Sequence, residues 1–386
     1  MSIFIVANFY KNGTMKSDDY KITENIMIVF VLILTAVICS GLTVSKKNEF
    51  YGDYCSPKNT SSINAVFSIL IFLSHAVQYI KPTGVLDEPY MDFRAFHGQL
   101  VVVTYLFFSG YGIMESIKKK GTDYVKAMPV NRLFKLWYHF AIAVLMFTAV
   151  SVGIAHKEYT LSRWLLAFVG LRSVGNSNWY LFATFTLYIL VIISFLIFKK
   201  SKKAALLCMC LLTVALVLFE MTIGERKLGL TIYYYNTILC FPLGMVFSML
   251  KPYFDKIFMK NDILWFFGFS ASVLLFAYFS QNRNENFPYY VLFTFFALAV
   301  IVFFMMKVNI KSSVLDWFGQ HIFSFFILQR IPMIILTHFG YNKDVNFFII
   351  VSFFGTVFLA VIFDAFTDKL DSIIFKNKII KNNKSA

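Results

Sequence analysis

Long apolar stretches separated by short polar loops dominate the pattern of this chain. A membrane-spanning helix needs about 20 mostly apolar residues, and a helix satisfies its own backbone hydrogen bonds in lipid. The pattern therefore predicts an all-α polytopic membrane protein with about eleven transmembrane helices. The eleven windows, each to within a few residues, are 25–44, 63–80, 99–117, 136–156, 179–198, 204–221, 230–249, 263–280, 289–307, 319–338 and 346–366.

Two regions outside these windows have their own interpretation. The stretch 160–170 is apolar but too short to span, and Arg163 lies near its start. It predicts an interfacial or re-entrant segment. The first 24 residues are polar, and no small-residue cleavage site follows the first window, so we expect an uncleaved chain.

The composition excludes several other classes of protein. The 386 residues are 58% hydrophobic and 15% charged, whereas soluble domains are roughly 45–50% apolar and about 25% charged. A soluble enzyme, a disordered linker and a disulfide-rich secreted scaffold are therefore excluded. The five cysteines are odd in number and scattered, so we expect neither a disulfide framework nor a metal site.

The distribution of positive charge predicts the orientation in a cell membrane. One set of alternate loops holds 23 Lys and Arg residues and the opposite set holds 12, with Arg330 inside a span. The positive-inside rule places the richer set in the cytoplasm, the N-terminus outside and the C-terminus inside. The excess of 36 basic over 21 acidic residues then indicates contact with anionic lipid and not with nucleic acid.

Two ionisable residues inside spans are candidates for function, because charge within a membrane is costly. His75 lies on a polar helical face with Asn64 and Gln78. Arg330 lies in a late span. Each is about 11–12 residues into its span, or ~17–18 Å from the inner face, which is compatible with a shared site. The alternatives are a histidine at a helix contact and an arginine bonded to backbone carbonyls.

Small and basic residues on two neighbouring helices suggest a route for a ligand. Ser109 and Gly110 lie near mid-membrane, where small side chains permit a close helix contact or leave a channel. Arg132 and Lys135, three residues apart at the start of a helix, suit phosphate binding. Ordinary anchoring by positive charge is the alternative for this basic loop.

A polar segment opens the span at 179–198. Asn178 and Trp179 follow a glycine, an asparagine and a serine. The aromatic residue fits an interfacial belt. The polar cluster caps the helix or lines an acceptor site.

Several of these motifs, taken in order, resemble the acyltransferase-3 superfamily of membrane acyltransferases. They are FLSHAVQY around His75, FFSGYG at 107–112, NRLFKLW at 131–137, NSNWYLF at 176–182 and FGQHIFSFFILQRIP at 318–332. The resemblance runs from about residue 58 to 366 and implies a ten-helix core preceded by one leading helix. The predicted organisation is an external segment, leading helix and cytoplasmic loop over 1–57, an acyltransferase-like domain over 58–366 and a basic cytoplasmic tail over 367–386.

The resemblance implies an O-acyltransferase, with acetyl as the usual group. The acyl group would move from cytoplasmic acyl-CoA, which is a donor substrate and not a bound cofactor, to a hydroxyl of a cell-surface or exported polysaccharide. His75 matches the family's functional histidine. The chain departs from the family pattern at Ala65, where an arginine is frequent, and at Gln329, where the late helix often carries Tyr-x-x-His.

The chemistry of acyl transfer assigns expected roles to these residues. A histidine takes the hydroxyl proton as a general base or carries the acyl group as a covalent relay. The roles are His75 as base or relay, Arg330 at the oxyanion, Arg132 and Lys135 at the coenzyme phosphates, Ser109 and Gly110 beside the pantetheine arm, and Asn178, Trp179 and Gln329 at the carbohydrate. The competing classes are a transporter or flippase for a glycan and a non-catalytic subunit that works with polysaccharide-assembly proteins.

Overall fold

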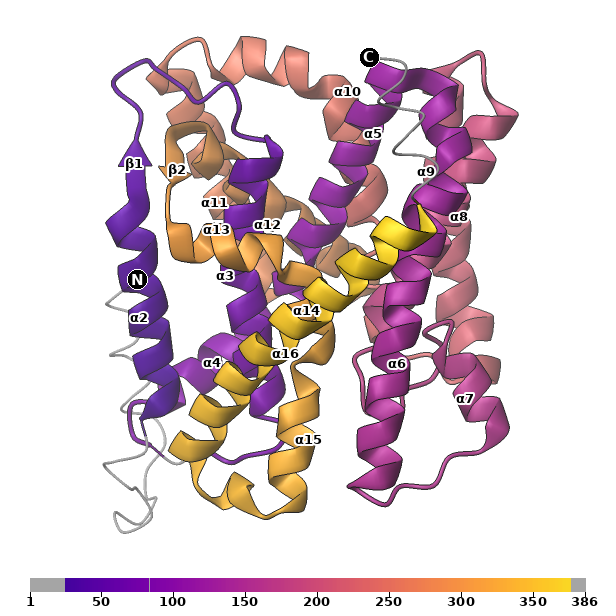
Figure 1. Cartoon of the computed structure of the whole chain (residues 1–386). Coiled ribbons are helices and arrows are strands. Elements are labelled where there is room, and N and C mark those ends of the chain that lie inside the picture. Colours follow the sequence, from indigo (N-terminus) through magenta and orange to yellow (C-terminus); the bar gives the residue numbers. More distant parts are fainter. Residues whose placement is uncertain (1–24, 83, 376–386) are drawn as a thin grey trace.

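Helices form nearly all of the regular structure in the computed structural model, which describes residues 25–82 and 84–375 (Figure 1). The helices are α2 (Ile26–Gly41), α3 (Pro57–Ala76), α4 (Glu88–His97), α5 (Leu100–Met128), α6 (Lys135–Gly153), α7 (Leu161–Ala167), α8 (Trp179–Ile197), α9 (Lys202–Phe219), α10 (Cys240–Phe258), α11 (Asp262–Gln281), α12 (Phe287–Lys307), α13 (Ser313–Gln320), α14 (Ile322–Leu328), α15 (Arg330–His338) and α16 (Val345–Ile374). Two short strands, β1 (Leu42–Val44) and β2 (Val308–Ile310), pair antiparallel. The predicted all-α class is confirmed.

The multi-pass character of the chain is also confirmed. Six helical stretches of the described residues are long and apolar enough to cross a membrane, and seven if a bent pair counts as one span. One of the six, Leu100–Gly153, has 54 residues and contains both α5 and α6, more than twice the length that one span of about 20 residues needs. The count of eleven spans and the orientation of the termini stay predictions. The predicted N-terminal segment and most of the basic tail lie outside the described residues.

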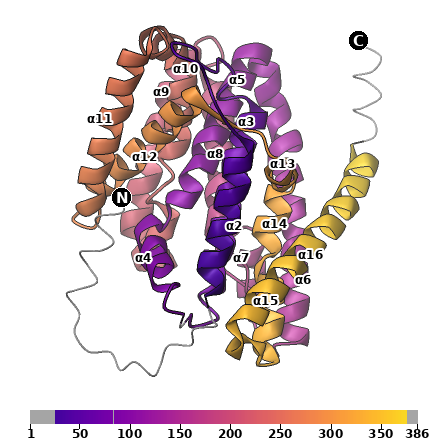
Figure 2. The same cartoon turned by 90° about the vertical axis from the view of Figure 1, so that its left-hand side faces the viewer.

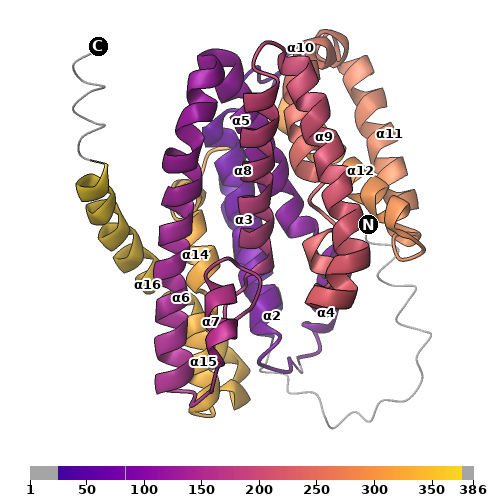
Figure 3. The same cartoon turned by 90° about the vertical axis from the view of Figure 1, so that its right-hand side faces the viewer.

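The helices lie roughly side by side, with α11 on one flank of the bundle and α16 crossing the opposite flank obliquely (Figures 2 and 3). Helices α3, α5 and α8 lie between them. We call the end where α5 joins α6, at the top of Figure 1, the α5–α6 end. The opposite end, where α6 leads into α7, is the α6–α7 end.

Two predicted windows differ in detail from the observed helices. The window 230–249 is wrong at its start, because α10 begins only at Cys240. A π-helix, Glu220–Leu228, ends at Gly229 with a φ of 61°, a left-handed conformation that glycine adopts easily and that stops a helix. The segment between Gly229 and α10 holds one short 3₁₀ turn, Ile232–Tyr234.

The window 319–338 is divided into α14 and α15. Pro332 has no backbone N–H to donate to the carbonyl of Leu328, four residues earlier, and its ring crowds that position. The helix is accordingly interrupted at one residue, Gln329, whose backbone angles stay helical. The preceding α13 meets this pair at an angle of 69°. The break places Arg330 at the first residue of a new helix.

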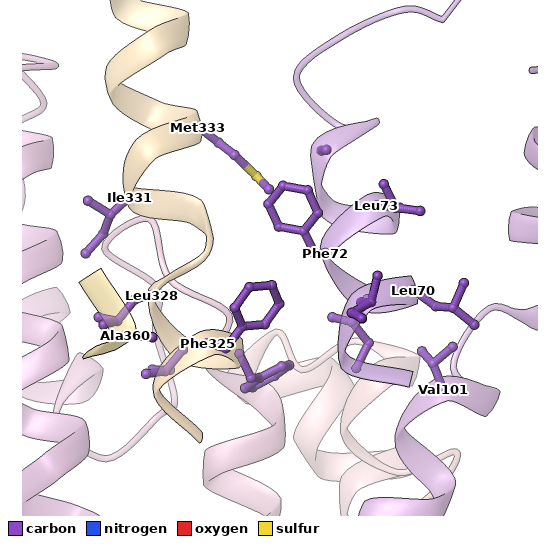
Figure 4. Packing of buried hydrophobic residues seen from close by; sticks show 14 of the residues in the cluster. Leu70, Phe72, Leu73, Val101, Phe325, Leu328, Ile331, Met333 and Ala360 are labelled. Carbon is purple, nitrogen blue, oxygen red and sulfur yellow. The ribbon is translucent and has the colours of Figure 1, made fainter. Parts of the chain in front are cut away.

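An apolar core fixes α3 against α14 and α15. Phe72 packs on Phe325 with their ring centroids 5.9 Å apart, and Met333 from α15 points toward the same ring of α3 (Figure 4). Phe72, Phe325 and Met333 are all fully buried. Burying each such side chain contributes roughly 1.5–3 kcal/mol. This packing holds the C-terminal end of α3, which carries His75, beside the start of α15.

Helices α5 and α10 contact each other through their backbones. A Cβ atom on Gly110 would lie 2.0 Å from the carbonyl oxygen of Phe241, and one on Gly244 would lie 1.9 Å from that of Phe107. Glycine is required at both positions because no side chain fits there. Of the two alternatives that the sequence left open for Gly110, the close helix contact is therefore the one observed, and this geometry does not support its predicted place beside the pantetheine arm.

Candidate functional site

His75 and Arg330, which the sequence placed at similar depth, meet through a third residue. The Nε atom of Arg330 donates to Oγ of Ser177 at 3.0 Å. The same Oγ lies 3.4 Å from Nε2 of His75. The three side chains come from α3, from the loop before α8 and from the first residue of α15. A hydroxyl, an imidazole and a guanidinium thus converge on one point.

The guanidinium of Arg330 makes its hydrogen bonds with side chains. It donates to Oε1 of Gln78 at 2.7 Å and to the hydroxyl of Tyr79 at 3.4 Å. No carboxylate among the described residues pairs with it. The alternative of an arginine bonded to backbone carbonyls is therefore not observed. Its charge stays available for an anion.

Gln329 lies behind the imidazole and does not line the cavity, contrary to the predicted contact with the carbohydrate. Its side chain is 1% exposed, and its Nε2 donates to the carbonyl of Phe326 at 2.8 Å. Gln329 is a close polar neighbour of His75. Within the described residues, its Oε1 and the Nδ1 of His75 are buried without a hydrogen-bond partner at normal distance. These two atoms are complementary, because an amide oxygen accepts and a ring N–H donates.

The loop that delivers Ser177 is held by its own polar residues. Oγ of Ser151 donates to the carbonyl of Val174 at 2.8 Å, and the backbone N–H of Val174 donates to Oδ1 of Asn176 at 3.1 Å. Nδ2 of Asn178 donates to the carbonyl of Gly170 at 2.6 Å. The polar cluster before α8 therefore builds the loop. The sequence singled out this cluster, which includes Ser177, but assigned Ser177 no role of its own.

A large cavity of about 1160 Å³ opens beside these residues toward the α6–α7 end. It is wide enough for a small-molecule or sugar substrate. The residues of this cavity that the sequence predicted are His75, Arg330, Asn178 and Trp179.

Two further cavities lie between this one and the α5–α6 end. An apolar cavity of about 150 Å³ shares Ile71, Val102 and Phe326 with the large cavity. Beyond it lies a cavity of about 560 Å³ lined by Ser109. Oγ of Ser109 lies 3.3 Å from the hydroxyl of Tyr188, which lines the apolar cavity, so this pair stands between the two. The three cavities form a series through the bundle.

The two basic residues predicted at the coenzyme phosphates are separated. Arg132 lines the cavity at the α5–α6 end together with Lys119 and Lys251. Lys135 does not line it, and its Nζ pairs with Asp371 of α16 at 2.5 Å. The segment Pro129–Phe134 is a π-helix. In an α-helix, residues three apart such as Arg132 and Lys135 lie on one face. The wider i→i+5 turns of a π-helix rotate them onto different faces.

A second group of histidines and carboxylates lies between α6, α14 and α16. His139 lies 3.2 Å from Asp371, and His321 contacts Asp364, which also accepts from Ser324 at 2.7 Å. Each histidine is thus partnered by its own carboxylate, and both pairs lie outside the three cavities. Among residues 25–82 and 84–375, no group of three or more His, Cys, Asp and Glu is arranged to hold a metal ion.

Comparison with known proteins identifies the family. A family model described as an acyltransferase domain matches residues 62–365, which is well over half of the 386 residues. No curated protein and no solved structure matches the chain. The matched range contains His75, Ser177 and Arg330 and most of the spanning helices. The chain belongs to the acyltransferase-3 family of membrane acyltransferases.

Proposed function

We propose that this protein is an O-acetyltransferase that moves an acetyl group from cytoplasmic acetyl-CoA to a hydroxyl of a cell-surface or exported polysaccharide. The observation that carries the proposal is the series of three cavities. Arg132 and Lys119 lie at one end of the series, and the convergent His75, Ser177 and Arg330 lie at the other. Family membership supports the acyl chemistry.

The donor would enter at the α5–α6 end, which the positive-inside rule assigns to the cytoplasm. Arg132 and Lys119 are exposed there and suit the phosphates of the coenzyme. The pantetheine arm would pass the hydroxyls of Ser109 and Tyr188 and cross the apolar cavity. The thioester would then arrive at Phe326, whose ring centroid is 6.4 Å from that of His75.

The acceptor hydroxyl would lose its proton to Nε2 of His75. A neutral imidazole has one donor and one acceptor nitrogen. If Nδ1 carries the proton and faces Oε1 of Gln329, Nε2 is the free base. The hydroxyl oxygen then attacks the thioester carbon, the carbon–sulfur bond breaks, and the coenzyme thiolate takes the proton from His75 and leaves as the thiol. Arg330 would stabilise the negative charge that develops on the carbonyl oxygen.

A covalent relay uses the same residues. Nε2 of His75 would attack the thioester first and later pass the acetyl group to the hydroxyl. Incubation of the protein with labelled acetyl-CoA and no acceptor distinguishes the two routes. Label trapped on His75 supports the relay, and its absence supports general-base catalysis.

A glycan transporter is the second candidate, and the sharp bend of 69° between α13 and the α14–α15 stretch favours it. Discontinuous helices at a binding site are typical of secondary transporters. A break is also tolerated wherever backbone is buried in protein or lines a cavity, as it is beside Arg330. Consumption of acetyl-CoA is a property of the enzyme and not of a transporter.

The test uses purified protein in liposomes with acetyl-CoA and measures release of the coenzyme thiol. We expect thiol release that increases when an acceptor polysaccharide is present. Acetyl analysis of surface glycans from cells with and without the protein identifies the natural acceptor. No thiol release with any acceptor, together with unchanged glycan acetylation, would refute the proposed function.

A further inference from the structure

Four cations line the large cavity beside His75. They are Arg94, Lys157, Arg163 and Arg330. None of them has a carboxylate partner among the described residues. One acidic residue, Glu158, also lines this cavity, so the formal charge of its wall is four positive and one negative.

One of the three additional cations, Arg94, is hydrogen-bonded to the turn that carries His75. Nε of Arg94 donates to the carbonyl of Ser74 at 3.4 Å, in the turn of α3 that carries His75. Arg94 and Arg330 both line the cavity beside the imidazole. Arg163 is fixed by a hydrogen bond of 2.9 Å from its Nε to the carbonyl of Ser173, in the loop that presents Ser177.

Like charges gathered in one cavity repel each other unless an anion neutralises them. Oriented cations in a concave wall concentrate anionic ligands and select against neutral ones. One guanidinium, that of Arg330, is enough to stabilise the oxyanion of acyl transfer. The other three cations are therefore not explained by the reaction alone.

The phosphates of the donor do not account for these charges. They would be bound by Arg132 and Lys119, beyond the apolar cavity and at the other end of the series. The wall of the large cavity also carries Trp179 and Tyr233, whose rings lie 6.4 Å apart and tilted by 31°. Such aromatic faces suit a sugar ring, with its apolar C–H groups and polar edge.

We propose that the acceptor is an anionic saccharide, whose carboxylate or phosphate is held by Arg94 while its hydroxyl faces His75. This inference rests on the proposed function and defines its substrate class. A fourth cavity, of about 470 Å³, shares Gly98, Gln99 and Tyr233 with the large one and carries Arg283. It gives room for a neighbouring unit of an anionic chain.

The test measures binding to the purified wild-type protein in nonionic detergent without any donor. The probes are an oligogalacturonate, an oligomer of glycerol phosphate and a neutral malto-oligosaccharide of similar length. We expect at least one anionic probe to bind at least tenfold more tightly than the neutral probe. Its affinity should fall as salt rises, because screening weakens charge pairing. Comparison of the oligogalacturonate with the glycerol phosphate oligomer shows whether the cavity prefers a carboxylate or a phosphate.

Two variants distinguish binding of the anionic probe in the cavity from its attraction to the general positive charge of the surface. Arg94→Gln removes a charge-assisted hydrogen bond and should weaken the better anionic probe by about tenfold. Arg226→Gln removes the same charge from an exposed position that lines none of the cavities and should leave the affinity unchanged. Equal binding of neutral and anionic probes, or equal losses in both variants, would overturn the anionic acceptor. Thiol release from acetyl-CoA in the same preparations tests the proposed function separately.

Discussion

Replacing Arg132 with Gln should weaken donor binding, whereas the same change at Lys135 should not. Arg132 lines the cavity at the α5–α6 end and is exposed to a ligand there. Lys135 is turned away by the π-helix and is paired with Asp371 at 2.5 Å. The two residues are three apart in sequence and carry the same charge. Lys135→Gln is therefore a matched control for Arg132→Gln.

The size of the effect follows from the partners in that cavity. A hydrogen bond between charged groups contributes about 1.5–3 kcal/mol, and about 1.4 kcal/mol corresponds to a factor of ten. Of the other cations, Lys251 is already paired with Asp255 at 2.6 Å, and Lys119 stays free of a carboxylate partner. We therefore expect the KM for acetyl-CoA to rise at least tenfold in Arg132→Gln. Lys135→Gln loses a half-exposed ion pair and should cost at most about 1 kcal/mol of stability.

The assay is thiol release by the purified variants over a range of acetyl-CoA concentrations. A clamp remote from the reacting atoms supplies uniform binding, so KM should rise while kcat changes little. The KM of Lys135→Gln should stay within twofold of wild type. An unchanged KM in Arg132→Gln, or equal increases in both variants, would refute the assignment of this cavity to the coenzyme phosphates.

Three further predictions address orientation, catalysis and pH. Single cysteines placed in 118–135 and in 222–229 should be labelled from opposite sides of the membrane, and labelling from one side would refute the predicted orientation. Gln329→Leu removes the acceptor that holds the proton of His75 on Nδ1 and should lower kcat about tenfold. Gln329→Glu keeps an acceptor there and should retain more activity. Equal losses in the two variants would contradict this positioning role. Burial, followed by the nearby charge of Arg94, lowers the pKa of His97 in α4 to about 4 from 6.5. As the pH falls, His97 is therefore protonated in the unfolded chain before it is protonated in the folded protein. Up to about 3 kcal/mol of stability should be lost between pH 6.5 and 4. Melting temperatures in detergent should show this loss in wild type and a smaller one in His97→Asn.

Most helices could be predicted from the sequence because apolar length alone specifies a span. The start of α10 could not, since the preceding apolar residues form turns and a π-helix whose geometry has no clear periodic pattern. The break before α15 had a readable signal in Pro332. Such a break becomes interpretable only when the neighbouring cavity is known.

The similar depth of His75 and Arg330 was compatible with a shared site, but the sequence did not indicate the residue between them. Ser177 is 102 positions from His75, and its contact depends on the path of the loop before α8. The pairing of Lys135 was misjudged because α-helical spacing was assumed across a π-helix. Arg94 reaches the same cavity from α4, a short helix between predicted spans, where sequence spacing carries no information about distance.

Acyl transfer by wild-type protein and by His75→Ala tests the central claim most directly. Both proteins are placed in liposomes with acetyl-CoA and an acceptor polysaccharide, and acetyl incorporation is measured after equal insertion and folding have been verified. Loss of a general base costs about 10²–10⁴-fold, so His75→Ala and His75→Gln should lose nearly all transfer. If either variant keeps more than about a tenth of wild-type transfer, His75 is a packing histidine and the catalytic assignment is wrong.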